Sequence, residues 1–202
     1  MTSSNQSKPR AWQRMLSGRR LDLLSPDPKD IEIEDIAHGL ARVARWNGQT
    51  QGSYAFSVAQ HSLIVTDIVH ALQPEYAQNE LLAALLHDAP EYVIGDLISP
   101  FKTAIGLDYK AFEHKLLQAI YCRFGIRELS LSAAGAIKQA DTVAAYYEAT
   151  RLAGFEKSEA ETFFEIPNLP TELHNALAVL KPVSASDAQT LFLAKFAELL
   201  PH

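Results

Sequence analysis

The sequence predicts a single all-α domain, and three features of it lead to this prediction. Apolar residues recur at helical spacing in several long segments, Ser, Gly and Pro stand where those segments would begin or end, and alternating strand-like patterns are few. The 202 residues, 48% of them hydrophobic and 21% charged, suit one domain with its own core, and no repeat or linker divides them. We expect a partly flexible N-terminal extension at 1–24 and one helical domain at 25–202.

Six helices are expected, at about residues 30–46, 57–72, 74–88, 108–124, 132–152 and 186–200. The first has apolar residues at helical spacing and stops at Gly48, although Ile31 and Ile33 alternate with acidic residues and leave a short strand open at its start. Ser57, with Gln60 three residues later, fits a capping box at the start of the second helix.

The remaining elements follow from prolines, glycines and amphipathic spacing. Pro90 interrupts the hydrogen-bond ladder of the third helix, and residues 91–94 make one further turn that Gly95 ends. The fourth and fifth helices are predicted from their apolar stripes. The segment 154–185 contains three prolines and is expected to be irregular, and the last helix is expected to be capped at Ser186.

Charge and composition narrow the classes of function. A net charge of −6 and a pI of about 5.6 disfavour a polymeric nucleic acid, which requires a basic face. A small phosphorylated ligand stays compatible, because a bound metal ion supplies positive charge locally. The single cysteine, Cys122, stands among apolar residues, so we expect a reduced and buried thiol. We find no signal-peptide pattern and no apolar run of about 20 residues, and therefore expect a cytoplasmic protein without a membrane partner.

A candidate metal site begins with the adjacent residues His87 and Asp88 at the end of an apolar helix. Successive helical residues differ by about 100° in direction, so both can reach an ion placed off the helix edge. Upstream, His61 lies in the first turn of another helix; downstream, Asp141 lies on an apolar face, where its charge needs a partner. That partner is either a metal ion or a basic side chain, and a histidine near a helix C-terminus is common without any metal. Spacing alone leaves both interpretations open.

The wider motif set is more specific than any of its pieces. It comprises Arg45-Trp46, then His61, then HDAPEYVIGDLISPFK from His87 to Lys102, and finally KQAD at 138–141. This set resembles the HD-domain metal-dependent phosphohydrolases, which are named for the paired His-Asp, and within them the bacterial 5′-deoxynucleotidases. The resemblance covers about residues 45–148. The chain departs from the deoxynucleotidase pattern in having Ala59-Gln60 where Ser-Glu is usual, and in a longer stretch between Trp46 and His61.

The resemblance implies a role for each matching residue. It implies one divalent transition metal (Mn, Co, Fe, Ni or Zn), held by His61, His87, Asp88 and Asp141. Glu91 and Asp96 would position water and transfer protons. Arg45 would bind phosphate through its planar fork of donors, Trp46 would border the nucleoside, and Lys102 would be a second phosphate contact. Without the motif, the two carboxylates fit a helix end and a turn, the tryptophan fits a core aromatic, and the lysine fits the surface.

The implied activity is the removal of phosphate from a nucleoside monophosphate, expected to be a 5′-deoxynucleotide, by a metal-activated water. The resemblance also implies a homodimer. Three alternatives remain at this point: a related HD enzyme that releases triphosphate from a dNTP, a non-catalytic module that only binds metal and nucleotide, and an unrelated helical scaffold with a chance His-Asp pair.

Overall fold

The predicted all-α class is confirmed by the computed structural model, which describes residues 11–97, 107–164 and 166–200. The helices that it describes are η1 (Pro28–Asp30), α1 (Ile33–Leu40), η2 (Arg45–Gly48), α2 (Val58–Leu72), α3 (Gln78–Leu85), α4 (Glu91–Ile94), α6 (Leu107–Arg123), α7 (Leu131–Arg151), α8 (Lys157–Phe163), α9 (Thr171–Ala178) and α10 (Ala185–Leu199). Strands β1 (Trp12–Arg14) and β2 (Arg20–Asp22) pair antiparallel. None of the described helices has the length and apolar character needed to cross a bilayer.

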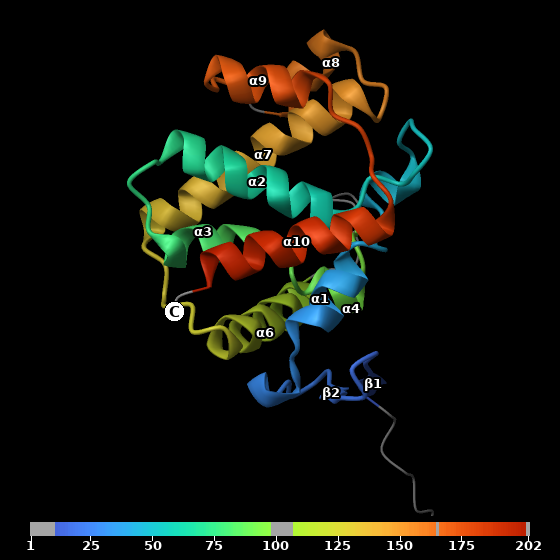
Figure 1. The fold of residues 1–202 in the computed structure, drawn as a ribbon, viewed down its shortest axis with the longest axis vertical. Helices are drawn as coiled ribbons and strands as arrows, with labels where there is room; N and C mark the ends of the chain where they lie inside the picture. The colour runs from blue at the N-terminus through green and yellow to red at the C-terminus, as the bar shows by residue number, and fades with distance from the viewer. Residues whose placement is uncertain (1–10, 98–106, 165, 201–202) are drawn as a thin grey trace, which may run out of the picture.

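The hairpin β1–β2 lies at one end of the molecule (Figure 1). Leu21 is fully buried, and the backbone N–H and hydroxyl of Ser17 donate to the Asp35 carboxylate at 2.9 and 2.6 Å. The hairpin is therefore attached to α1 by hydrogen bonds, and Leu21 joins it to the hydrophobic core. The division of the chain after residue 24 stays a prediction, and residues 1–10 lie outside the described part of the chain.

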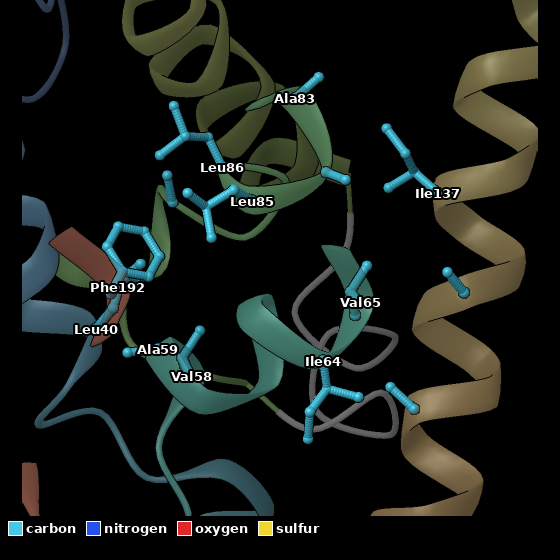
Figure 2. Close-up of a cluster of buried hydrophobic side chains, with 14 of the residues drawn as sticks. Leu40, Val58, Ala59, Ile64, Val65, Ala83, Leu85, Leu86, Ile137 and Phe192 are labelled. Carbon is cyan, nitrogen blue, oxygen red and sulfur yellow. The ribbon is translucent and has the colours of Figure 1, made fainter. Parts of the chain in front are cut away.

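Helix α2 is the central element of the core. It packs against α7, α3 and α10, which lie around it (Figure 1). Its buried side chains point in several directions, as a helix enclosed on most sides requires. In Figure 2, Val58, Ile64 and Val65 of α2 lie among Leu85 of α3 and Ile137 of α7. This packing fixes the N-terminal turn of α2 relative to the elements that carry the other candidate site residues.

The first helix is shorter than predicted, because pairing between distant segments takes over after Leu40. Ala44 forms an antiparallel bridge with Ser57, and the Val58 N–H donates to the Val43 carbonyl at 3.0 Å. Because residues 43 and 44 pair with residues 57 and 58, α1 ends at Leu40, six residues before the predicted end. The alternative of a strand at residues 31–33 is not formed, since Ile31 and Glu32 join η1 to α1 and Ile33 is the first residue of α1.

The segment 154–185 is not irregular as predicted, because it contains α8 and α9. Its prolines mark helix boundaries: Pro170 stands at the N-cap of α9, and Pro182 precedes α10. Helix α10 begins two residues earlier than predicted, and its cap is Ser184, whose hydroxyl accepts from the Asp187 N–H at 3.1 Å.

Two smaller predictions also need correction. Helix α3 begins at Gln78 rather than at Pro74, because residues 74 and 75 form a turn after α2. Cys122 is exposed rather than buried. It follows the buried Ile120 by two residues, which places it about 200° around the helix from that side chain.

The predicted cap of α2 is confirmed, since the Ser57 hydroxyl accepts from the Gln60 N–H at 3.3 Å. In a complete capping box the Gln60 side chain would also accept a hydrogen bond from the Ser57 N–H. Instead, the Gln60 side-chain amide donates to the Lys181 carbonyl at 3.2 Å and accepts from the Val183 N–H at 3.0 Å. The residue before His61 therefore holds the segment that leads into α10, which gives a structural reason for glutamine where the deoxynucleotidase pattern has glutamate.

Candidate active site

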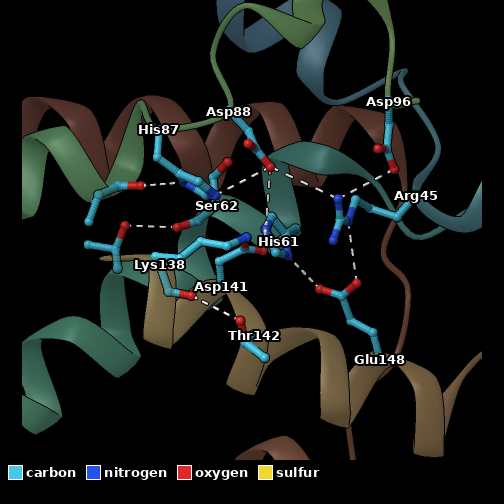
Figure 3. A network of polar contacts seen from close by, with 12 residues as sticks. Arg45, His61, Ser62, His87, Asp88, Asp96, Lys138, Asp141, Thr142 and Glu148 are labelled. Atoms are coloured by element: carbon cyan, nitrogen blue, oxygen red, sulfur yellow. Dashed lines mark hydrogen bonds and ion pairs between the residues drawn. The ribbon is translucent and has the colours of Figure 1, made fainter. Parts of the chain in front are cut away.

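The four side chains predicted as metal ligands converge from three parts of the fold (Figure 3). His61 lies in the first turn of α2, His87 and Asp88 lie in the turn between α3 and α4, and Asp141 lies in α7. His61 Nε2 is 3.3 Å from Asp141 Oδ1 and 3.5 Å from Asp88 Oδ2, and His87 Nε2 is 3.3 Å from the same Asp88 oxygen. Ligands bound at about 2.1 Å in tetrahedral directions lie about 3.4 Å apart, so these separations fit a shared ion. His61, His87 and Asp88 offer ligand atoms that all lie within 4.8 Å of one another, and Asp141 adjoins this group through its contact with His61.

The turn that carries His87 and Asp88 results from the early end of α3. The helix stops at Leu85, and the Ala89 N–H donates to the Leu86 carbonyl at 3.0 Å in a tighter turn. Pro90 cannot continue the ladder of α3 and instead stands at the N-cap of α4. The neighbouring imidazole and carboxylate are thereby turned toward His61. The predicted turn at residues 91–94, ended by Gly95, is confirmed.

The Nδ1 contacts of both histidines determine which ring nitrogen is available. His61 Nδ1 lies 2.6 Å from Glu148 Oε1, and His87 Nδ1 lies 2.8 Å from the Ala84 carbonyl oxygen. Both neighbours accept hydrogen bonds, so Nδ1 carries the proton and a neutral ring presents its Nε2 lone pair. Within the described part of the chain, both buried Nε2 atoms lack a hydrogen-bond partner. A buried acceptor left unsatisfied costs about 1–3 kcal/mol, and a metal ion would satisfy both.

Charge shapes the protonation of this cluster. Burial alone would raise the pKa of the Asp88 carboxyl, but His87, His61 and Arg45 hold it far below its ordinary range. Burial and Arg45 would lower the pKa of His61, but Glu148 and Asp141 together raise it to about 10. Without a metal ion, a proton therefore resides on His61. An ion must displace that proton, so we expect its binding to tighten as the pH rises.

Arg45 lies beside the candidate ligands and is surrounded by carboxylates. Its Nη1 is 3.4 Å from Asp96 Oδ2 and 4.0 Å from Asp88 Oδ2, and its Nε is 3.3 Å from Glu148 Oε2. Burial would lower the pKa of the guanidinium, but these carboxylates hold it well above its ordinary value. Arg45 therefore brings a permanent positive charge to the edge of the site, next to Asp96.

The sequence comparisons identify the family. Residues 35–196, which are most of the chain, match the family model described as 5′-deoxynucleotidase YfbR-like. The protein belongs to the YfbR-like 5′-deoxynucleotidase family. Members of this family are HD-domain hydrolases of the nucleotidase type. A Rhodobacter capsulatus protein described as uncharacterized is 58% identical over 160 residues, which cover 79% of this chain and 82% of that protein.

In this YfbR-like chain the cluster opens into a cleft of about 1050 Å³. The predicted site residues that line it are Arg45, Trp46, His87, Asp88, Glu91, Asp96 and Asp141. Glu91 begins α4 and is only 1% exposed, so its carboxylate lies at the inner end of the cleft rather than at a solvated helix end. Lys102 lies outside the described residues. The structure thus brings together every predicted site residue that it describes.

One wall of the cleft is aromatic, and most of it was not predicted. We call Trp46, Phe155, Phe163 and Phe164 the aromatic wall. The ring of Trp46 lies edge-on to Phe155 and Phe164, with centroid distances of 5.7 and 6.0 Å. Phe163 lines the cleft while 67% exposed, which leaves much of a large apolar side chain available to a ligand. The wall depends on α8, the helix that apolar spacing did not indicate.

Sequence reasoning also missed Glu148. This residue is fully buried and contacts Arg45, Trp46 and His61 (Figure 3). A signal for it exists in the sequence: it follows Asp141 by seven residues, close to two helical turns, and therefore lies on the same face of α7. Its neighbours Tyr147 and Ala149 are buried, so its charge required a partner.

Proposed function

We propose that this protein hydrolyses nucleoside 5′-monophosphates, with 5′-deoxynucleotides as the expected substrates, and releases a nucleoside and inorganic phosphate. The observation that carries the proposal is the pair of buried imidazole Nε2 atoms that face the same Asp88 carboxylate. Each of these atoms offers an ion its lone pair once the ring is neutral. Family membership supports the nucleotidase class. The relative from Rhodobacter capsulatus is uncharacterized and adds no substrate.

The donor set fits one divalent transition metal. His61, His87, Asp88 and Asp141 would hold it, and two imidazoles with two carboxylates suit Mn²⁺, Fe²⁺, Co²⁺, Ni²⁺ or Zn²⁺. When bound, such an ion supplies Lewis-acid polarisation of the phosphoryl group and lowers the pKa of water. Asp141 can serve while paired with a lysine, because Lys138 Nζ contacts its Oδ2 at 2.7 Å and leaves Oδ1 facing His61.

Arg45 is the proposed phosphate-binding residue. Its contacts to carboxylates within the described part of the chain use Nε and Nη1, so Nη2 can donate to a phosphate oxygen. The carboxylates on either side hold the guanidinium plane in place before substrate arrives, which lowers the entropy lost on binding. Arginine suits this role because its planar donors match the geometry of phosphate oxygens.

Glu91 and Asp96 are the proposed proton-transfer and water-positioning residues. As water attacks phosphorus, a P–O bond to water forms and the bond from phosphorus to the nucleoside oxygen breaks. Glu91 at the inner end of the cleft would accept the proton of the attacking water. Glu91 would then pass that proton to the departing nucleoside oxygen. Asp96, which is ion-paired with the phosphate-binding Arg45, would orient the attacking water.

The aromatic wall favours a nucleoside over a small phosphoester. A base stacked on an aromatic side chain gains about 1–3 kcal/mol, and this gain does not depend strongly on which base is bound. Phe163 and Trp46 border the same cleft as the candidate metal ligands, so a nucleotide can place its phosphate by Arg45 and its base along the wall. We therefore expect weak discrimination between bases.

The decisive experiment measures phosphate release from a panel of nucleoside mono- and triphosphates. The protein is stripped of metal, and Mn²⁺, Co²⁺, Ni²⁺ or Zn²⁺ is added back singly. Asp88→Asn removes a candidate ligand, and Asp67→Asn, an exposed carboxylate on the same helix as His61, is the matched control. Metal-dependent release of phosphate from monophosphates in the wild type and the control, but not in Asp88→Asn, is the expected result.

The other outcomes are equally informative. Release of triphosphate from a dNTP would replace the proposal with the triphosphohydrolase activity. Metal binding without turnover of any nucleotide would replace it with a binding or sensing role. Activity that persists in Asp88→Asn would overturn the assignment of the metal ligands.

A further inference from the structure

We infer that Glu148 is a positioning residue that fixes a metal ligand, the phosphate-binding arginine and the cleft tryptophan through a single carboxylate. The inference rests on the proposed function, because it takes the proposed roles of His61, Arg45 and Trp46 as given. It concerns a residue that the motif set does not include.

The contacts of Glu148 divide between its two oxygens. Oε1 lies 2.6 Å from His61 Nδ1, while Oε2 accepts from Trp46 Nε1 at 2.8 Å and from Arg45 Nε at 3.3 Å. The side chain is fully buried, so water does not compete for these hydrogen bonds. Figure 3 shows the carboxylate pointing from α7 between His61 and Arg45. One side chain therefore links η2, α2 and α7.

The contact to His61 selects the tautomer that a ligand needs. A carboxylate accepts hydrogen bonds and cannot donate one, so Nδ1 must carry the ring proton and Nε2 must present its lone pair. This places the lone pair toward Asp88 and Asp141. Carboxylates that orient histidine ligands in this way are common around metal sites. His87 receives the same orientation from a backbone carbonyl, so Glu148 is the side chain on which the His61 orientation depends.

The contacts to Arg45 and Trp46 coincide with an unusual backbone turn. Trp46 and Asn47 have φ values of 57° and 50°, in the left-handed region that large side chains rarely occupy. Residues held there cost about 1–3 kcal/mol each and persist only when the surroundings enforce them. This turn directs two consecutive side chains to the same oxygen of Glu148. The strain is thus located where phosphate and nucleoside groups would be held.

A structural role alone does not explain this arrangement. A buried charge that only filled space would be replaceable by an apolar side chain at little cost or with a gain in stability. All three partners of Glu148 are instead candidate site residues, and each must donate a hydrogen bond to stay in place. Loss of the carboxylate would therefore disturb metal binding and substrate binding together.

Glu148→Gln tests the inference because it changes hydrogen bonding with almost no change in shape. The amide has one accepting oxygen and one donating nitrogen, so it cannot accept from all three partners. We expect the oxygen to stay with Arg45 and Trp46, since a cation and an indole can only donate. The amide nitrogen then faces His61 Nδ1, which loses its proton, and the proton moves to Nε2, where a ligand lone pair is required.

The expected result is Zn²⁺ binding that is about 10- to 100-fold weaker in Glu148→Gln by calorimetry, as for other residues that orient ligands. The ¹⁵N spectrum of the histidines should show a protonated Nδ1 on His61 in the wild type and an unprotonated one in the variant. Tyr147→Phe is the matched control. It removes the 2.7 Å hydrogen bond from the neighbouring residue of α7 to His174, and it should leave both measurements unchanged.

Several results would overturn the inference. One is Zn²⁺ affinity in Glu148→Gln equal to that of the wild type; another is equal weakening in Tyr147→Phe, which would mean that only the packing of α7 matters. If Glu148→Gln does not fold, the wild type still decides: an unprotonated Nδ1 on His61 in the Zn²⁺-loaded protein would refute the role. A wild type that binds Zn²⁺ but cleaves no nucleotide would overturn the proposed function instead, and the tautomer measurement would stand apart from it.

Discussion

A pair of glycine-to-alanine substitutions tests how closely α4 is held against α1. A Cβ added at Gly39 on α1 would lie 2.8 Å from Tyr92 Cβ and 3.0 Å from the Tyr92 carbonyl oxygen, whereas one added at Gly135 on α7 would meet nothing within 4 Å. Tyr92 is the neighbour of Glu91, the proposed proton acceptor. Both glycines are helical, so alanine changes helix propensity in the same direction at both sites and introduces a clash only at Gly39.

The magnitude follows from these distances. Alanine for glycine in an open helical position stabilises by about 0.5–1 kcal/mol, which is the expectation for Gly135→Ala. At Gly39 the closest contact must lengthen from 2.8 Å to at least 3.4 Å, where ordinary van der Waals contact begins. Overpacking of this kind costs about 1–3 kcal/mol. The two variants should therefore differ by about that amount, or by about 2–4 °C in Tm for each kcal/mol in a protein of this size.

The assay combines thermal unfolding with nucleotidase kinetics. Gly135→Ala should raise Tm and leave kcat unchanged. Gly39→Ala should lower Tm relative to Gly135→Ala, and kcat should fall roughly tenfold, because α4 moves by a sizeable fraction of an ångström and carries Glu91 with it. If Gly39→Ala is as stabilising as Gly135→Ala and keeps full activity, the tight contact between α1 and α4 does not position the carboxylate, and the reasoning is wrong.

Three further outcomes are expected. The pKa of His61 is raised to about 10, so its proton stabilises the metal-free fold fully below the unfolded pKa of about 6.5, and this contribution is lost as the pH rises toward 10. Thermal shift should therefore show Tm of the metal-free protein falling across that range, while the gain in Tm on adding Zn²⁺ grows. Phe163→Ala should raise KM for nucleoside monophosphates about tenfold in steady-state kinetics, with kcat unchanged, because base stacking is lost. Hydrolysis of deoxyribose 5-phosphate, which has no base, should be unaffected in the same assay. Gln60→Glu should lower the free energy of unfolding by about 1–3 kcal/mol in urea titrations, since a carboxylate cannot donate to the Lys181 carbonyl.

Candidate site residues that lie close to a helix-capping or helix-breaking residue could be predicted from the sequence. His87 and Asp88 lie shortly before Pro90, which predicted a break in the helix. The structure shows a turn there, although α3 already ends at Leu85 rather than at the predicted residue 88. Ser57 marks the start of α2, and hence the position of His61 one turn later. Spacing could not decide whether Asp141 pairs with a lysine or faces the other candidate ligands. The structure shows that it does both, through different oxygens.

The features that sequence reasoning missed depend on tertiary contacts. The left-handed backbone of Trp46 contradicts the local preference of tryptophan, and it is enforced by Glu148 and by Phe155 and Phe164. Helix α8 is short and has one buried apolar residue, Ala160, so it carries no clear periodic signal of its own. Both features shape the aromatic wall. The aromatic side of the cleft, where we propose that the nucleoside binds, was therefore less predictable than the side that carries the candidate metal ligands.

The charge balance of the cleft links metal binding to substrate binding. The described carboxylates within or beside the cleft are those of Asp88, Glu91, Asp96, Glu113, Asp141 and Glu148. The described cations there are Arg45, Lys110, Lys138 and, while no ion is bound, the protonated His61. Arg45 and Lys138 are themselves held by these carboxylates. A phosphate dianion entering such a site would meet mainly negative charge, so the protein's own cations are not enough to bind it. A divalent ion bound at the candidate metal site would add the positive charge that lets an anionic substrate enter this acidic cleft. The carboxylates that repel phosphate are also the groups that attract the ion. The metal and the nucleotide are therefore expected to bind in that order.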